Sequence, residues 1–215
     1  MSSGLDLFHT EASTAKDLLA ELYGLVLQED PLRLEGFIPL VDEEGIIIDT
    51  YAISIVPSDN YPNSFPYVHE TAGRLPHNID WHIFPDGHFC IKASPEEQLI
   101  CINGITLLSF IQGQVVPYLF NQNFREKFGY FLKERSHGIK GNLEFFKEIF
   151  STNDLLKIRK YLMFILKRSK PTRVELCFCG SRIKYRKCHR DAYQMLSPLP
   201  DRTIAMYIKL IDSYK

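Results

Sequence analysis

The chain has 215 residues, of which 45% are hydrophobic and 24% are charged, so it can bury a core without disulfide staples. The N-terminus lacks the basic and apolar regions of a secretory signal, and the longest purely apolar runs fall far short of the ~18 residues of a membrane span. Five cysteines are an odd count for a disulfide framework. We therefore expect a cytoplasmic protein whose cysteines serve metal binding or catalysis.

The net charge of −1 conceals an uneven distribution. Residues 151–190 carry twelve Lys or Arg against Asp154 and Glu175, which leaves the rest of the chain near −11. This concentration of positive charge marks the C-terminal part as distinct.

The first predicted element is an amphipathic helix that Ser13 or Thr14 caps and Pro31 stops. Its apolar stripe follows helical spacing. The residues of this stripe are Leu18, Leu19, Leu22, Leu25 and Val26.

Residues 37–41 and 46–56 are β-rich runs joined by an Asp-Glu-Glu-Gly turn, and residues 67–68 can add a short strand. Residues 69–103 show no sustained periodicity and are predicted to form a long loop. Loops of this length inside a compact domain are usually functional.

Helical periodicity returns at residues 105–119, where Pro117 kinks or shortens the helix, and continues through 124–133 and 143–150. A basic helix at 154–168 and a last helix at 203–214 follow. We expect an α+β domain over residues 1–150 and a small helical module over 151–215.

Cys177, Cys179, Cys188 and His189 form a C-x-C-x8-C-H pattern. Three thiolates and an imidazole are the ligand set that zinc prefers in closed structural sites. The pattern resembles the SEC-C motif, which has Cys-x-Cys-Gly-Ser, a basic middle that contains tyrosine, and Cys-His. The resemblance implies a structural zinc ion in a small docking module.

The basic rim of this module includes Lys184, Arg186 and Lys187, which could contact nucleic acid or an acidic partner. No series of aromatic residues for base stacking accompanies it, so nucleic acid is not the expected partner. If it were, binding would depend steeply on salt.

A second pattern runs from Tyr61-Pro62 and Pro66 through the histidine-rich loop to Gly87-His-Phe-Cys90-Ile91. Helix, strand meander, Tyr-Pro segment, loop, cysteine and helix follow in the order of the ubiquitin-conjugating (UBC) fold, which this region resembles. That resemblance implies that Cys90 is catalytic. The family's His-Pro-Asn tripeptide is replaced by His77-Asn78 or His82, so either Asn78 or His82 would stabilise the oxyanion.

An Asp-Gly-x-x-Cys active site and an Arg-Ser-His-Gly turn at residues 135–138 are similar to the conjugating-enzyme homologues of bacterial CBASS anti-phage operons. The resemblance implies a thioester between the cysteine and the C-terminus of a cyclic-oligonucleotide synthase. The chain has no glycine-rich phosphate loop, so an activating enzyme would act from elsewhere.

Two cysteines compete as the nucleophile. Cys90 has the family spacing, with His82 and His88 close enough in sequence to favour its thiolate. Cys101 precedes Asn103-Gly104, which can open a helix whose N-terminus would favour a thiolate. Buried structural cysteines remain the alternative for both, in which case the protein is a catalytically inactive adaptor.

Overall fold

The computed structural model describes residues 4–214, without the side chains of residues 15–23. The chain forms two compact units: unit 1 (Met1–Lys92 and Asn103–Glu134) and unit 2 (Ala93–Ile102 and Arg135–Lys215). The boundary that we expected at residue 150 falls inside unit 2. Phe146 and Phe150 lie in the same buried core as the helices that follow them, which explains the difference.

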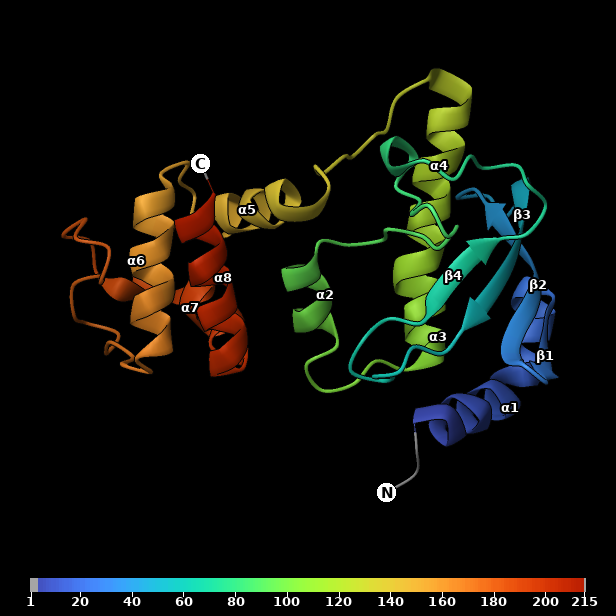
Figure 1. Cartoon of the computed structure of the whole chain (residues 1–215), viewed down its shortest axis with the longest axis horizontal. Coiled ribbons are helices and arrows are strands. Elements are labelled where there is room, and N and C mark those ends of the chain that lie inside the picture. Colours follow the sequence, from blue (N-terminus) through green and yellow to red (C-terminus); the bar gives the residue numbers. More distant parts are fainter. Residues whose placement is uncertain (1–3, 215) are drawn as a thin grey trace. The chain divides into compact units, whose positions relative to one another are not determined.

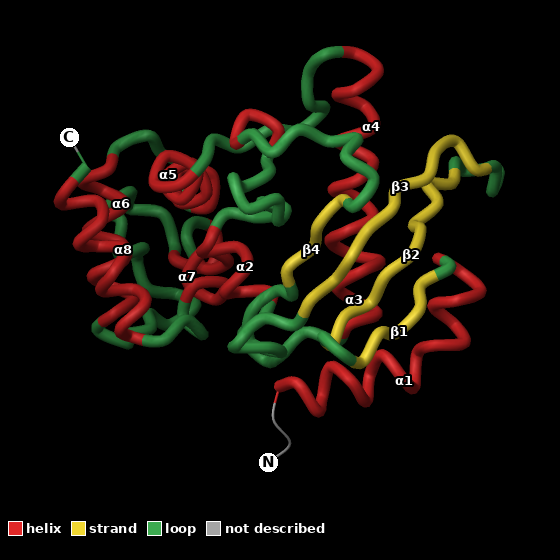
Figure 2. The backbone as a smooth tube through the Cα atoms, turned by 45° about the vertical axis from the view of Figure 1, so that its right-hand side comes forward, coloured by secondary structure: helices red, strands yellow, loops and turns green. Residues whose placement is uncertain are grey.

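Unit 1 contains a four-stranded antiparallel sheet whose strands follow the order of the chain, drawn in yellow in Figure 2. Its strands are β1 (Leu25–Glu29), β2 (Leu32–Val41), β3 (Ile47–Val56) and β4 (Tyr67–Glu70). The sheet confirms the α+β class and the predicted meander. The predicted loop after β4 holds only short elements, η1 (Ile79–Trp81) and α2 (Ser94–Ile100).

One face of this sheet is the core of unit 1. Ile38, Tyr51 and Ile53 are completely buried, whereas Phe37, which points to the opposite face, is 59% exposed. This alternation follows from the two-residue period of a strand.

The N-terminal helix differs from the prediction at both ends, because α1 spans Gly4–Tyr23. Thr14 lies within the helix and donates its hydroxyl to the carbonyl of Thr10 at 2.7 Å, so it is not a cap. Leu25 and Val26 belong to β1 instead of the helix. The other leucines of the predicted stripe have side chains outside the described residues.

The helix predicted at 105–119 is the composite α3 (Leu107–Phe110), η2 (Ile111–Val115) and α4 (Val116–Phe128). The middle turn is π-helical, and the amide of Val116 donates to the carbonyl of Ile111. Pro117 has no amide hydrogen for a helical bond, and the helix accommodates it directly after this wider turn. The helix therefore continues past Pro117.

A polar network ties the loop after β4 to β3 and α4. Arg74 donates to both carboxylate oxygens of Asp49, at 2.8 and 2.6 Å, and to Glu126 at 2.8 Å. The guanidinium also lies 4.2 Å from the centre of the Tyr51 ring, and Tyr51 donates its hydroxyl to Glu126. This network fixes the start of the segment that leads to Cys90.

Unit 2 is helical. Figure 1 shows α6 (Leu155–Leu166) beside α8 (Asp201–Ser213), and the two helices are in contact. The remaining helices are α2, α5 (Gly138–Ile149), η3 (Tyr185–Lys187) and α7 (Arg190–Leu196). Asp154 caps α6 by accepting from the amides of Leu156 and Lys157, which agrees with the predicted start.

No helix within residues 4–214 is both long enough and apolar enough to cross a bilayer.

Candidate functional site

The loop from residue 78 to residue 90, which we call the 78–90 loop, is fixed to the sheet of unit 1. The amide of Phe89 donates to the carbonyl of Val68 in β4 at 2.8 Å, and Ile83 pairs with Phe89 across the loop. Gly87 turns the chain with a φ of 93°. The His77 ring lies so close to Gly87 that an added Cβ would be 2.6 Å from it. Cys90 therefore follows a rigid hairpin-like turn.

His82 occupies an unusual position in this loop. Its φ of 53° places it in the left-handed region, where side chains other than glycine are uncommon. Its amide donates to the carbonyl of Ile79, and its own carbonyl accepts from the amide of Cys90 and the hydroxyl of Tyr118, both at 2.7 Å. Such a conformation persists only where its surroundings hold it.

The side chains of His82 and Cys90 meet. A ring nitrogen of His82 and the sulfur of Cys90 lie within 4.8 Å of each other. Cys90 is half-buried, and the His82 side chain is 13% exposed. A thiol beside an imidazole is an arrangement in which the thiol can lose its proton to the ring.

Tyr118 lies close to this pair. Burial raises the pKa of Tyr118, a hydrogen bond with Gln122 opposes the rise, and a charge on Cys90 would add to it. The phenol therefore stays protonated and remains a hydrogen-bond donor. Its ring stacks on Phe89 with centres 4.5 Å apart, which holds the donor in place.

Asn78 has a structural position. Its side-chain oxygen accepts from the amide of Asp80 at 2.9 Å, which caps the short helix η1, and its carbonyl accepts from the amides of Trp81 and Ile83. The side-chain oxygen of Asn78 is thus engaged in a hydrogen bond within the loop.

His88, the other imidazole expected beside Cys90, has different neighbours. It bonds Asp86 at 2.6 Å and stacks on Phe84 with centres 4.2 Å apart. Burial, followed by the charge of His88, lowers the pKa of nearby His69. The structure places a ring nitrogen of His82 within reach of the Cys90 sulfur, whereas the ring of His88 bonds Asp86.

Cys101 does not lie at a helix N-terminus, so the dipole argument for it is wrong. It is the C-cap of α2, and the next helix, α3, begins at Leu107. The C-terminal end of a helix disfavours negative charge. Burial, with a further contribution from Glu97, raises the pKa of Cys101 to about 12. Cys101 is therefore a buried thiol, unsuited to act as a thiolate at neutral pH.

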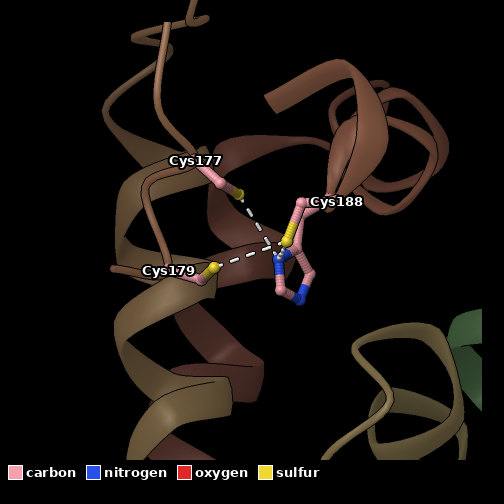
Figure 3. Close-up of side chains that lie close together, drawn as sticks. Cys177, Cys179 and Cys188 are labelled. Carbon is pink, nitrogen blue, oxygen red and sulfur yellow. Dashed lines mark hydrogen bonds between the residues drawn. The ribbon is translucent and has the colours of Figure 1, made fainter. Parts of the chain in front are cut away.

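Unit 2 brings the predicted metal ligands together. The ligand atoms of Cys177, Cys179, Cys188 and His189 all lie within 4.8 Å of one another, and we call this group the Cys/His cluster. Figure 3 shows the three cysteine sulfurs pointing toward a common centre. Cys188 Sγ is 3.5 Å from Cys179 Sγ and 3.2 Å from His189 Nδ1.

A tight hairpin builds this cluster. The amide of Cys177 donates to the carbonyl of Ile183 at 2.8 Å, and the amide of Tyr185 donates to that of Glu175 at 2.8 Å. Gly180, with a φ of 80°, turns the chain after the Cys-x-Cys pair. Tyr185, the tyrosine within the basic middle of the motif, is 1% exposed and anchors the hairpin in the core.

The orientation of His189 suits metal binding. Its Nε2 lies 3.3 Å from the carbonyl oxygen of Phe150, to which it can donate, leaving Nδ1 directed at the sulfurs. A hydrogen bond to the second ring nitrogen is the usual way in which proteins orient a metal-binding histidine. The ring also packs against Tyr161, with centres 5.0 Å apart.

The thiols of the cluster differ in acidity. Burial raises the pKa of Cys177 to about 12. Burial also opposes ionisation of Cys179, but hydrogen bonds with Ser181, Cys177 and Cys188 outweigh it and lower its pKa to about 6. Cys179 can therefore offer a thiolate near neutral pH, and the cluster could hold a metal ion.

Comparison with protein families identifies one match, the SEC-C motif, at residues 175–191. These residues contain the whole Cys/His cluster. No curated protein and no solved structure matches the chain.

Sequence reasoning missed two side chains beside His82. Phe131 meets the His82 ring edge-on with centres 5.0 Å apart, and Glu134 Oε1 lies 3.8 Å from His82 Nε2. Neither belongs to a recognisable motif, and both reach the 78–90 loop only through the fold of unit 1.

Proposed function

We propose that the chain is a cysteine-dependent protein-conjugating transferase of the ubiquitin-conjugating kind, with Cys90 as its nucleophile. The observation that carries this proposal is the pairing of Cys90 with a His82 ring nitrogen within 4.8 Å. The succession of helix, four-stranded meander, cysteine loop and helix in unit 1 supports it. The burial of Cys101 and its raised pKa favour Cys90 over this competing candidate.

The proposed reaction is a thioester exchange. A partner protein arrives with its C-terminal carboxyl already activated as a thioester on an activating enzyme. The Cys90 thiolate attacks the carbonyl carbon, a new carbon–sulfur bond forms, and the bond to the activating enzyme's sulfur breaks. The departing thiolate takes up a proton, so that atoms and charge balance.

The resemblance to CBASS conjugating proteins suggests the partner. It would be the C-terminus of a cyclic-oligonucleotide synthase encoded beside this chain. The SEC-C module would serve as a docking element. Its exposed residues Lys184, Arg186 and Lys187 favour a binding partner with an acidic surface.

Trapping tests this proposal. The full-length chain, co-expressed with the synthase and activating enzyme of its operon, should form an adduct that thiol reductants release. Cys90→Ser should give an oxyester that resists thiols but not alkali, Cys90→Ala should give none, and Cys101→Ala should behave as wild type. An adduct that survives Cys90→Ala, or the absence of an adduct in wild type, would contradict the proposed enzymatic function and favour a catalytically inactive adaptor.

We also propose that the Cys/His cluster holds zinc. The donor set of three sulfurs and one nitrogen is the one zinc takes in closed tetrahedral sites, and it leaves no open position for a substrate. Zinc there would hold the hairpin together without taking part in catalysis. Metal analysis of the purified chain should give about one zinc per molecule. Loss of bound metal in Cys179→Ser and its retention in Cys90→Ser would assign the ion to this cluster.

A further inference from the structure

The carboxylate of Glu134 accompanies the Cys90–His82 pair. Glu134 Oε1 lies 3.8 Å from His82 Nε2, and the Glu134 side chain is 55% exposed while that of His82 is 13% exposed. The separation exceeds a direct hydrogen bond but lies within the range of an ion pair. The carboxylate would therefore attract the ring whenever the ring carries a proton.

His82 does not depend on Glu134 for its place. Its backbone is held by the hydrogen bonds with Ile79, Cys90 and Tyr118, and its ring rests edge-on against Phe131. Substitution of Glu134 should consequently change the electrostatics of the imidazole without displacing it.

The guanidinium of Arg125 packs on Phe131, the same ring that His82 contacts. The guanidinium of Arg125 is 4.4 Å from the centre of the Trp81 ring and 4.5 Å from that of Phe131, and Arg125 donates to the carbonyl of Asp80. A like charge disfavours protonation of an imidazole. Glu134 lies within ion-pair distance of His82, and its charge is opposite in sign to that of Arg125.

We propose that Glu134 acts through His82 by stabilising its protonated ring, and that the two residues together maintain Cys90 as a thiolate beside an imidazolium ion. This inference rests on the proposed role of Cys90 as the nucleophile. The proton leaves Cys90 Sγ for the His82 ring, the thiolate forms its bond to the acyl carbon, and the departing thiolate recovers the proton from the imidazolium. The carboxylate stabilises the charged ring throughout and forms no bond to the substrate.

In this proposal His82 accepts the proton of Cys90, whereas the resemblance to the UBC family implied that Asn78 or His82 stabilises the oxyanion. As an imidazolium, the ring attracts the negative charge of the thiolate, which is the active form of the nucleophile. Removing the carboxylate would favour the neutral thiol and imidazole at neutral pH. At high pH the thiol ionises without help, so the effect of Glu134 should vanish there.

The rate at which Cys90 is alkylated in the full-length chain measures how much of its thiol is present as thiolate. Iodoacetamide is applied across a range of pH, and modification is read from the Cys90 peptide by mass spectrometry. Glu134→Gln should slow alkylation at neutral pH by about threefold to tenfold and leave it unchanged well above the ordinary thiol pKa of about 8.5. Glu134→Asp should restore part of the rate, His82→Gln should lose at least as much, and Glu43→Gln, in an exposed turn, should match wild type.

Two outcomes separate this inference from the proposed function. If Glu134→Gln alkylates at the wild-type rate at neutral pH, or is slowed equally at high pH, the electrostatic role of Glu134 is wrong even if the thioester adduct forms. If the alkylation pattern holds but wild type forms no adduct with its partner, the Cys90–His82–Glu134 arrangement stands and the conjugating function fails. Circular dichroism melting of each variant confirms that the comparison is made between folded proteins.

Discussion

The amide of Cys90 donates a hydrogen bond of 2.7 Å to the carbonyl oxygen of His82. This bond joins the residue that carries the thiol to the residue that carries the imidazole, across the turn that separates them. The same carbonyl accepts from the hydroxyl of Tyr118 at 2.7 Å, so a residue of α4 holds both.

Removing that hydroxyl should loosen the 78–90 loop. Tyr118→Phe keeps the ring that stacks on Phe89 but loses one hydrogen bond from a buried donor. We expect the free energy of unfolding to fall by about 1 kcal/mol and alkylation of Cys90 to slow. Urea denaturation checks the first result. Tyr130→Phe, at a 61% exposed ring, is the matched control and should leave both unchanged; equal stability of Tyr118→Phe and wild type would refute this role.

Arg74 should be the most important charged residue for the stability of the loop after β4. Arg74→Met leaves Asp49 and Glu126, whose side chains are only 19% and 21% exposed, without their cation. We expect a loss of about 1–3 kcal/mol in the free energy of unfolding, measured with urea. Arg74→Lys keeps the charge but not the paired geometry and should fall in between. A loss in the Lys variant as large as in the Met variant would assign the effect to geometry alone.

The same network predicts a dependence on pH. Hydrogen bonds from Arg74 lower the pKa of Asp49 below its ordinary 3.8, although burial opposes them. A carboxyl whose pKa is lower in the folded state contributes stability above its unfolded pKa and loses it as the pH falls through the folded value. The difference in stability between wild type and Arg74→Met should be widest near neutral pH and should narrow below pH 3.8. Urea titrations at several pH values test the direction, and a gap that widens in acid would contradict it.

Metal removal should act on the hairpin of unit 2. A strong chelator is expected to raise the rate of amide hydrogen exchange at residues 175–189. The hairpin has few backbone hydrogen bonds, so a bound metal ion would contribute much of its stability. His189→Ala should reproduce this effect without chelator, while Cys90→Ser should not. Binding should weaken in acid, since the thiolates and the imidazole must lose their protons to bind. Unchanged exchange after complete metal removal would show that the hairpin does not need the ion.

Gly141 offers a test of the packing around α5. An added Cβ would overlap the carbonyl oxygen of Ser136, so Gly141→Ala should destabilise the protein despite the better helix propensity of alanine. Gly113 also lies in a helix but has open space where its Cβ would be. Gly113→Ala should therefore be neutral or stabilising by up to about 1 kcal/mol. Thermal unfolding distinguishes the two, and equal effects would show that the clash at Gly141 is relieved by a shift of the chain.

The sequence by itself determined the features that depend on local pattern. The β-rich runs on either side of the Asp-Glu-Glu-Gly turn predicted the strands around Tyr51, because β propensity and turn chemistry are local properties of the chain. The C-x-C-x8-C-H spacing predicted the Cys/His cluster, because both ligand pairs sit in turns and the chain between them is short. The basic amphipathic run from residue 154 predicted the start of α6, where the side chain of Asp154 accepts from the amide of Leu156.

Only the tertiary structure decided which side chains surround the pair formed by Cys90 and His82. Glu134 and Tyr118 lie far from it in the sequence, and no local periodicity marks them. Cys101 shows the same limit. Its position shortly before a predicted helix start suggested a favourable dipole, but Cys101 belongs to unit 2 and its thiol is buried at the C-terminus of α2. Spacing along the chain fixes local geometry, whereas the electrostatic environment of a thiol depends on groups that only folding brings near it.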